Sequence, residues 1–271
     1  MYEKNGGMTL IEAMVVMVLE CLIIYLLFDI FVNVERRHQI INQLNEIKYT
    51  GQTAIDLLNS ELHQAGYIGC QSLNKANPVI SHVPETITLE NRIVGYQNGV
   101  SVRHRSERSV QLLKKMHDYS HMYVSYDIKF HSNELLMISD CQHAEIFKLA
   151  KVTSTGHGQQ LTLVTPLTFL FDKTAEVGRL EINKFYLDKP KHPNEQTYAI
   201  FLENIHHEKF ELIDKIQQMK LNYLVLQKDQ LIELTVDQVT DWSTVKGVTV
   251  ELRLQQPNFK KTWYAYISTE N

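Results

Sequence analysis

The sequence predicts an α+β protein in which one long N-terminal helix, part of it a membrane span, packs against a mainly antiparallel β-sheet. Three observations lead to this prediction. Residues 13–34 form an almost unbroken apolar run, residues 40–65 carry apolar side chains at steps of three and four, and short runs after residue 86 alternate between apolar and polar. Steps of three and four mark one face of a helix, whereas alternation marks one face of a strand.

The apolar run at residues 13–34 is about as long as the ~20 residues that a helix needs to cross a bilayer core. Acidic residues mark its start, its middle and its far end, at Glu12, Glu20 and Asp29. A lone carboxylate in hydrocarbon costs several kcal/mol. We therefore expect these acids to have partners in a helical bundle or to be solvated there, with snorkelling as the alternative for Glu20 and Asp29.

The helix is expected to continue well beyond the span. No proline occurs between residues 8 and 65, and Gly51 is the only glycine in that stretch. This predicts one long helix with a soft point at Gly51 and a stop at Gly66. The expected organisation is a long helix over residues 8–66, with the span at about 13–34, followed by a β-rich globular domain over residues 67–271.

The β-rich part is predicted from period-two alternation. Half-buried strands are expected at residues 122–130, 161–165 and 180–187. The clearest alternation lies at residues 248–254 and 262–267, on either side of a turn that contains Pro257 and Asn258. It indicates a C-terminal hairpin. Residues 236–245 are expected to form a short helical connection before it.

The composition favours a folded body that can bury a core. The chain has 271 residues, 44% of them hydrophobic, and only six prolines. Of its three cysteines, Cys21 lies in the span, whereas Cys70 and Cys141 lie in the soluble part. In an oxidising compartment Cys70 and Cys141 would form a disulfide that contributes a few kcal/mol. Two buried free thiols are the alternative.

The charges that flank the span give an opposing indication of orientation. Arg36 and Arg37 follow the span directly, whereas Lys4 is the only basic residue before it. The positive-inside rule, taken alone, would place the body in the cytoplasm. The difference in charge is small.

The segment GMTLIE at residues 7–12, followed by the apolar helix, resembles the processing site of type IV prepilins and pseudopilins. Met8 stands where phenylalanine is usual. The resemblance implies that a membrane peptidase removes a leader, residues 1–7, by cutting after Gly7, and methylates the new N-terminus at Met8. Because that peptidase acts on the cytoplasmic side, the body would be periplasmic.

Glu12 would then be the fifth residue of the mature chain. A carboxylate one turn from a freed amine can pair with the amine of a neighbouring subunit and offset two desolvation costs. Such a contact would set the axial register of packed helices in subunit assembly. An ordinary single-pass anchor, with Glu12 at the headgroups, is the alternative.

The segment ELHQAGYIGC at residues 61–70 resembles the end of the long helix in PilW-type minor pilins, and the likeness continues at residues 135–141, 199–223 and 241–254. The resemblance implies a structural subunit that takes part in type IV pilus assembly or initiation at the inner membrane. Its partners would be other minor pilins, the major pilin, the prepilin peptidase, the inner-membrane assembly machinery and membrane lipid. A type II secretion minor pseudopilin of the J type and a membrane-anchored periplasmic ligand-binding module are the alternatives.

The sequence offers little sign of an enzyme. It contains no Gly-rich phosphate loop, no Gly-x-Ser-x-Gly and no His-Glu-x-x-His. His117 and His121 have no evident third metal ligand, and the rings of the adjacent His206 and His207 would point apart on a strand. We therefore expect no catalytic residues, no cofactor and no metal.

One run of basic residues is a candidate nucleic-acid contact. Its members are Arg103, His104, Arg105, Arg108, Lys114 and Lys115. Six such groups could engage phosphates without sequence preference. Glu107 interrupts the run, and the aromatic residues that stack on bases are missing from it. We expect a solvated face and not a nucleic-acid contact.

Overall fold

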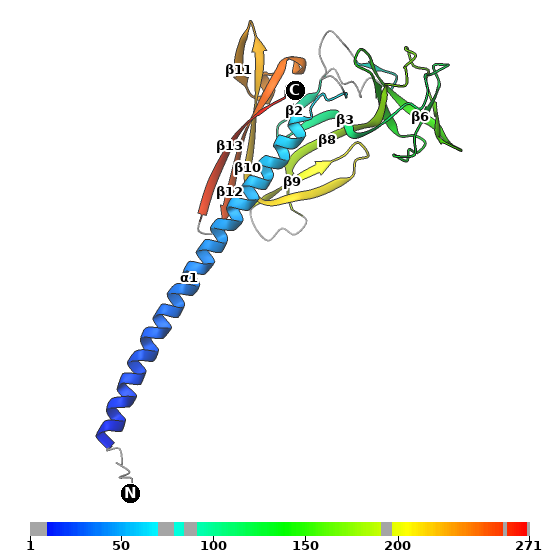
Figure 1. Ribbon diagram of the computed structural model, residues 1–271. Helices are drawn as coiled ribbons and strands as arrows, with labels where there is room; N and C mark the ends of the chain where they lie inside the picture. The colour runs from blue at the N-terminus through cyan, green and yellow to red at the C-terminus, as the bar shows by residue number, and fades with distance from the viewer. Residues whose placement is uncertain (1–9, 70–78, 84–90, 191–196, 257–258, 270–271) are drawn as a thin grey trace.

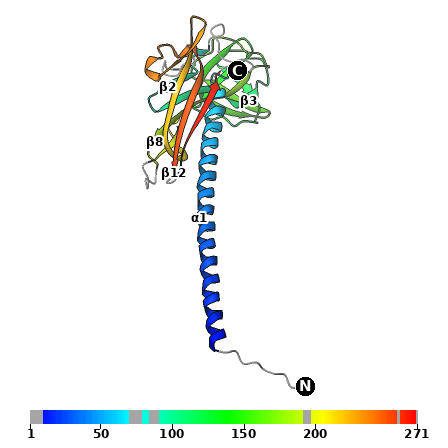
Figure 2. The same cartoon turned by 90° about the vertical axis from the view of Figure 1, so that its left-hand side faces the viewer.

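The computed structural model describes residues 10–69, 79–83, 91–190, 197–256 and 259–269. Within these residues it has one α-helix, α1 (Leu10–His63), which runs out of a β-rich body. Figures 1 and 2 show the first part of α1 standing clear of the body like a stem. The expected α+β architecture, a long apolar N-terminal helix packed on an antiparallel sheet, is confirmed at this level.

Helix α1 is continuous for 54 residues, without a break at Gly51. It begins at the first described residue and ends at His63, slightly before the expected stop. Its buried residues are Ile47, Gly51, Ala54, Leu58 and Leu62. Their steps of three and four confirm the predicted apolar face, and only the second part of that face is covered by the body.

Thirteen strands form one extended sheet in the described part of the chain, in the order β13-β12-β10-β9-β8-β5-β6-β7-β4. Strand β3 pairs with β8, β2 with β3 and β11 with β10. Among the strand pairs that the structure describes, only the short pairing of β1 with β6 is parallel. The strands are β1 (Ile80–Ser81), β2 (Ile93–Tyr96), β3 (Gly99–Gln111), β4 (His121–Val124), β5 (Leu135–Ser139), β6 (Ala144–Thr155), β7 (Gly158–Leu163), β8 (Glu176–Asp188), β9 (Tyr198–Glu203), β10 (Lys209–Gln227), β11 (Gln230–Leu234), β12 (Val245–Gln256) and β13 (Phe259–Ser268).

The C-terminal hairpin is confirmed. Strand β13 pairs over its whole length with residues 247–256 of β12, with Leu252 opposite Trp263 and Val248 opposite Ile267. Pro257 and Asn258, the expected turn residues, lie outside the described residues. The expected helical connection is present as two short 3₁₀ helices, η1 (Val236–Gln238) and η2 (Trp242–Thr244).

The strand expected at residues 122–130 ends early, at Val124. The side-chain amide of Gln159 donates hydrogen bonds to the carbonyl oxygens of Ser125 and Ile128 and accepts one from the amide of Phe130. One buried glutamine therefore satisfies the backbone groups that a neighbouring strand would otherwise pair. Alternation alone cannot reveal this substitution of a side chain for a strand.

Three groups of buried side chains fill the body. The largest lies between α1 and strands β3, β8, β10, β12 and β13, and a second lies inside the lobe that contains β4 to β7. The third and smallest contains Ile68, Met137, Ala144, Ile146 and Leu180, and lies where the chain leaves α1. The end of α1 therefore lies near this third group, which is separate from the two larger groups of buried side chains.

At Gly51 the backbone of α1 lies against the indole of Trp263 on strand β13. A Cβ atom at this position would be 2.1 Å from Nε1 and 2.4 Å from Cε2 of Trp263. The glycine therefore provides room for the indole. Gly51, the expected soft point in the helix, instead allows a close contact between the helix and the sheet.

The substitution Gly51→Ala tests this contact. Alanine is a better helix former by about 1 kcal/mol, but we expect the free energy of unfolding to fall by about 1–3 kcal/mol because the indole must move. Urea denaturation of the full chain in detergent micelles measures the change. Thr53→Ala, at an exposed position of the same helix, is the control for helix propensity. A gain in stability equal to that of the control would contradict the close packing.

Candidate functional site: the projecting helix and its attachment

The first part of α1 projects from the body with its apolar side chains uncovered. Leu10, Phe28 and Phe31 have 80%, 65% and 66% of their surface exposed. Among the described residues α1 is the helix that is long and apolar enough to cross a membrane, and none of its most apolar stretch is buried in the body. This arrangement is compatible with single-pass membrane anchoring.

The polar residues expected in the span all lie on this projecting part. Glu12 is in the first turn of α1 and is exposed, as is Glu20. The side-chain amide of Asn33 donates to the backbone oxygen of Asp29 at 2.9 Å and to its carboxylate at 3.3 Å. Asp29 thus has a partner one turn along its own helix. The two residues are four positions apart in the sequence, a spacing that indicates such a pair on a helix.

A short stretch between the span and the body is also uncovered. We call residues 35–46 the neck. Ile40 and Leu44 are 42% and 45% exposed, whereas Ile47, the next residue on the same face, is 2% exposed. Lys215 of β10 forms an ion pair with Glu46 at this boundary. The apolar face that packs on the body therefore continues past the edge of the body toward the membrane span.

At its other end the helix is attached to the body through residues 66–69, which we call the exit segment. Gly66 has a φ of 76°, a left-handed conformation that ends the helix at little cost. Its amide donates to the Arg103 carbonyl, and the Arg105 amide donates to the Tyr67 carbonyl, both at 2.8 Å. The exit segment thus forms backbone hydrogen bonds with strand β3.

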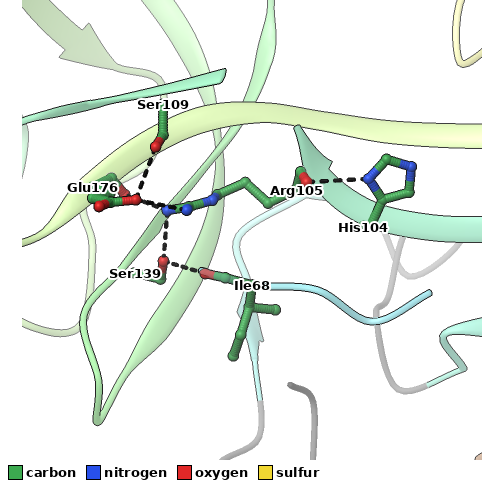
Figure 3. A network of polar contacts seen from close by, with 6 residues as sticks. All are labelled: Ile68, His104, Arg105, Ser109, Ser139 and Glu176. Atoms are coloured by element: carbon green, nitrogen blue, oxygen red, sulfur yellow. Dashed lines mark hydrogen bonds and ion pairs between the residues drawn. The ribbon is translucent and has the colours of Figure 1, made fainter. Parts of the chain in front are cut away.

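The side chain of Arg105 joins this segment to two other strands (Figure 3). Its Nη1 donates to Ser139 Oγ at 3.0 Å, and its Nη2 donates to the Glu176 carboxylate at 2.7 Å. Ser139 donates in turn to the Ile68 carbonyl, and Ser109 donates to the same Glu176 oxygen at 2.8 Å. We call these five residues the Arg105 network.

Two residues of the exit segment also cover the guanidinium. The Tyr67 ring centre is 5.5 Å from the Arg105 Cζ, a distance suited to a cation–π contact. Gly69 has a φ of 121°, and a Cβ there would be 2.9 Å from Nη2. The sequence GYIG at residues 66–69 therefore provides a helix stop, an aromatic cover, a carbonyl acceptor and a close backbone approach around one buried cation.

Glu176 completes the charge balance of the network. Burial raises the pKa of this carboxyl, but the hydrogen bonds from Ser109 and Arg105 and the Arg105 charge outweigh it, so the pKa lies below its usual value of 4.5. Its contribution to stability is therefore present above about pH 4.5 and is lost as the pH falls through the lowered value. The carboxylate form is the one that the network requires.

The basic residues that follow one another near Arg105 do not form one surface. Arg105 and His104 are 0% and 2% exposed, and adjacent residues of a strand project to opposite faces. Lys114 lies over the Tyr123 ring, with 3.8 Å between Nζ and the ring centre. The run of basic residues at positions 103–115 is thus divided between two faces and partly buried.

The histidine pairs have carboxylate neighbours near them in the chain. His121 Nδ1 is 2.9 Å from Asp118 Oδ1, and His207 Nδ1 is 2.8 Å from Glu203 Oε1. Over the ranges that the structure describes, no group of three or more His, Cys, Asp or Glu side chains could hold a metal ion.

Some of the expected site residues lie beyond what the structure describes. Gly7 and Met8, the expected cleavage and methylation positions, are outside the described residues, as is Cys70. Cys141 is disulfide-bonded, whereas Cys21 is a free, exposed thiol on α1. The Cys70–Cys141 pairing remains a prediction.

The fold and this site define a class of protein: a β-rich body fixed to the second part of a long helix whose apolar first part is available for a membrane or for other helices. No protein-family model matches the chain, and no curated protein or solved structure is significantly similar to it.

Removal of the Arg105 side-chain charge tests the network. In Arg105→Met the Glu176 carboxylate and the Ser139 hydroxyl lose their hydrogen bonds from the guanidinium. Because Glu176 is 37% exposed and keeps its bond from Ser109, we expect a loss of about 1–3 kcal/mol in the free energy of unfolding. Arg108→Met, at an exposed position of the same strand, should change stability by about 0.5 kcal/mol or less. Urea denaturation of both full-length variants gives the comparison. Equal losses would show that the network does not hold the exit segment.

Proposed function

We propose that this protein is a minor pilin of the PilW type, a membrane-anchored structural subunit that takes part in type IV pilus assembly. The observation that supports this best is the division of one unbroken helix. Its apolar first part is exposed, and its second part is packed on an antiparallel sheet. A subunit that joins a helical bundle needs this arrangement, because the projecting part must be free to contact other helices while the body remains folded.

Glu12 lies where the proposed contact would be made. In the mature chain the amine of one subunit would pair with this carboxylate of its neighbour. The pair would form only at one axial offset between two helices, because either charge alone in the apolar bundle is costly. Assembly rather than catalysis is therefore the proposed role of Glu12, with other minor pilins and the major pilin as the partners.

The mature N-terminus provides the first test. Mass spectrometry of the membrane-extracted protein should show a chain that begins with N-methyl-Met8 and lacks residues 1–7. An intact leader would contradict the pilin proposal and favour an uncleaved anchor that carries a ligand-binding body. Pull-down of the cleaved protein with pilus or secretion components would distinguish a pilin from a type II secretion pseudopilin.

Glu12→Ala tests the assembly contact. We expect leader cleavage to continue and incorporation into sheared filaments, measured by immunoblot, to fall about tenfold, the factor that corresponds to ~1.4 kcal/mol. Glu35→Ala, which removes a carboxylate from the neck and not from the span, is the matched control. Normal incorporation of Glu12→Ala would remove the assembly role of Glu12 from the proposal.

The neck offers a second assembly contact. The uncovered part of the apolar face, at Ile40 and Leu44, is proposed to pack on the helix of a neighbouring subunit. Leu44→Glu should then reduce incorporation several-fold, because a buried unpaired charge is costly. Asn42→Glu adds the same charge on the opposite face of the helix and should have little effect. Thermal unfolding should be unchanged in both, since the body covers neither side chain. Equal incorporation of the two variants would contradict the contact.

A further inference from the structure

His104 lies between a carboxylate of the helix and a carboxylate of the sheet. Its Nε2 is 3.9 Å from Glu61 Oε2 of α1 and 3.9 Å from Glu181 Oε2 of β8. The ring is 2% exposed. Its Nδ1 is 3.1 Å from the Arg105 carbonyl oxygen, and within the described residues Nε2 has no hydrogen-bond partner.

We propose that His104 is a pH-sensitive clamp, which holds the last turns of α1 on the sheet when it is protonated and weakens that attachment when it loses its proton. The proposal concerns how the helix is fixed to the body. It therefore stands whether or not the protein is a pilin.

The hydrogen bond of His104 Nδ1 determines which ring nitrogen loses its proton when the imidazolium is deprotonated. A carbonyl oxygen can only accept, so Nδ1 must carry a proton in either charge state. The neutral ring then has a lone pair on Nε2, directed toward two carboxylates that repel it and each other. The imidazolium instead presents an N–H and a positive charge to both. The surroundings of the ring thus favour the charged form.

The other groups around the ring support this assignment. Glu61 faces it from the helix and Glu181 from β8, while the uncharged Asn183 donates to Glu61 Oε2 at 3.1 Å. The neighbouring Arg103 and Arg105 project from the opposite face of β3. Among the described residues, the charged side chains that face the ring are therefore the two carboxylates.

The pKa directions define the pH range of the clamp. Burial lowers the pKa of His104, but Glu61, the Arg105 carbonyl and Glu181 outweigh it and raise the pKa above 6.5. Burial raises the pKa of Glu61, but His104 and Asn183 outweigh it and lower the pKa below 4.5.

The sign of each contribution follows from these shifts. The contribution of His104 is complete below about pH 6.5 and is lost as the pH rises through its raised pKa. That of Glu61 is complete above about pH 4.5 and is lost as the pH falls through its lowered pKa. The clamp is therefore complete between about pH 4.5 and 6.5.

The consequence is local, because Glu61 lies in the last turn of α1, just before the exit segment. Loss of the His104 charge removes one of the contacts that fix this turn. The Arg105 network, on the other face of β3, keeps its own charges. We therefore expect alkaline pH to loosen the end of the helix without unfolding the body.

The test uses the full chain in detergent micelles. NMR titration of the His104 ring should give a pKa above 6.5. Hydrogen exchange of the amides at residues 56–63, corrected for the intrinsic effect of pH, should lose protection by roughly three- to tenfold between pH 6 and pH 9. In His104→Gln this loss should disappear, whereas His207→Gln, at an exposed histidine, should behave like the wild type.

Glu181→Gln provides a second variant if His104→Gln does not fold. Its side chain is 39% exposed, so the substitution should be tolerated, and it should move the His104 pKa toward 6.5. A His104 pKa at or below 6.5 in the wild type, or the same loss of protection in His104→Gln, would overturn the clamp.

Discussion

The buried guanidinium of Arg105 is the interaction on which the rest of the structure depends. A charge without exposed surface must be matched by partners with good geometry, since an unpaired one costs several kcal/mol. Here the partners are the Glu176 carboxylate and the Ser139 hydroxyl, and Ser139 in turn holds the Ile68 carbonyl. One side chain thus connects β3, β5 and β8 to the segment that follows the helix. The position of α1 relative to the sheet depends on this connection.

The helix itself is uniform in geometry, but its two parts have different surroundings. From Ile47 onward its apolar face is covered by β12 and β13, and Gly51 lets the Trp263 indole approach the helix backbone. Before Ile47 the same face continues through Leu44 and Ile40 without cover. Burial of the second part stabilises the body, whereas the exposed first part leaves an apolar surface that is compatible with a membrane or with contact to other helices. One helix therefore contributes its second part to the folded body and its first part to the proposed assembly contacts.

Adjacent residues of strand β3, His104 and Arg105, project to opposite faces of the strand and form different contacts. His104 faces Glu61 of the helix, and Arg105 faces the Ser139 and Glu176 side of the sheet. Both attach the end of α1, one through a titratable ring and the other through a permanent cation. In the sequence these residues belong to a run of basic side chains that is usual for a solvated face. Their burial depends on carboxylates from residues 61, 176 and 181, which are too far away in the chain for a local pattern to indicate.

Local patterns in the sequence determined the elements. The apolar run at residues 13–34, the steps of three and four beyond it and the alternation at residues 248–267 are each set by neighbours along the chain, so the helix, its apolar face and the C-terminal hairpin could be predicted. The tertiary structure decided the rest. It ended β4 at Val124, beyond which the Gln159 side chain pairs with the backbone, it placed Gly51 against Trp263, and it buried Arg105 and His104 among distant carboxylates. These outcomes depend on contacts between residues far apart in sequence, whose energies no local periodicity contains.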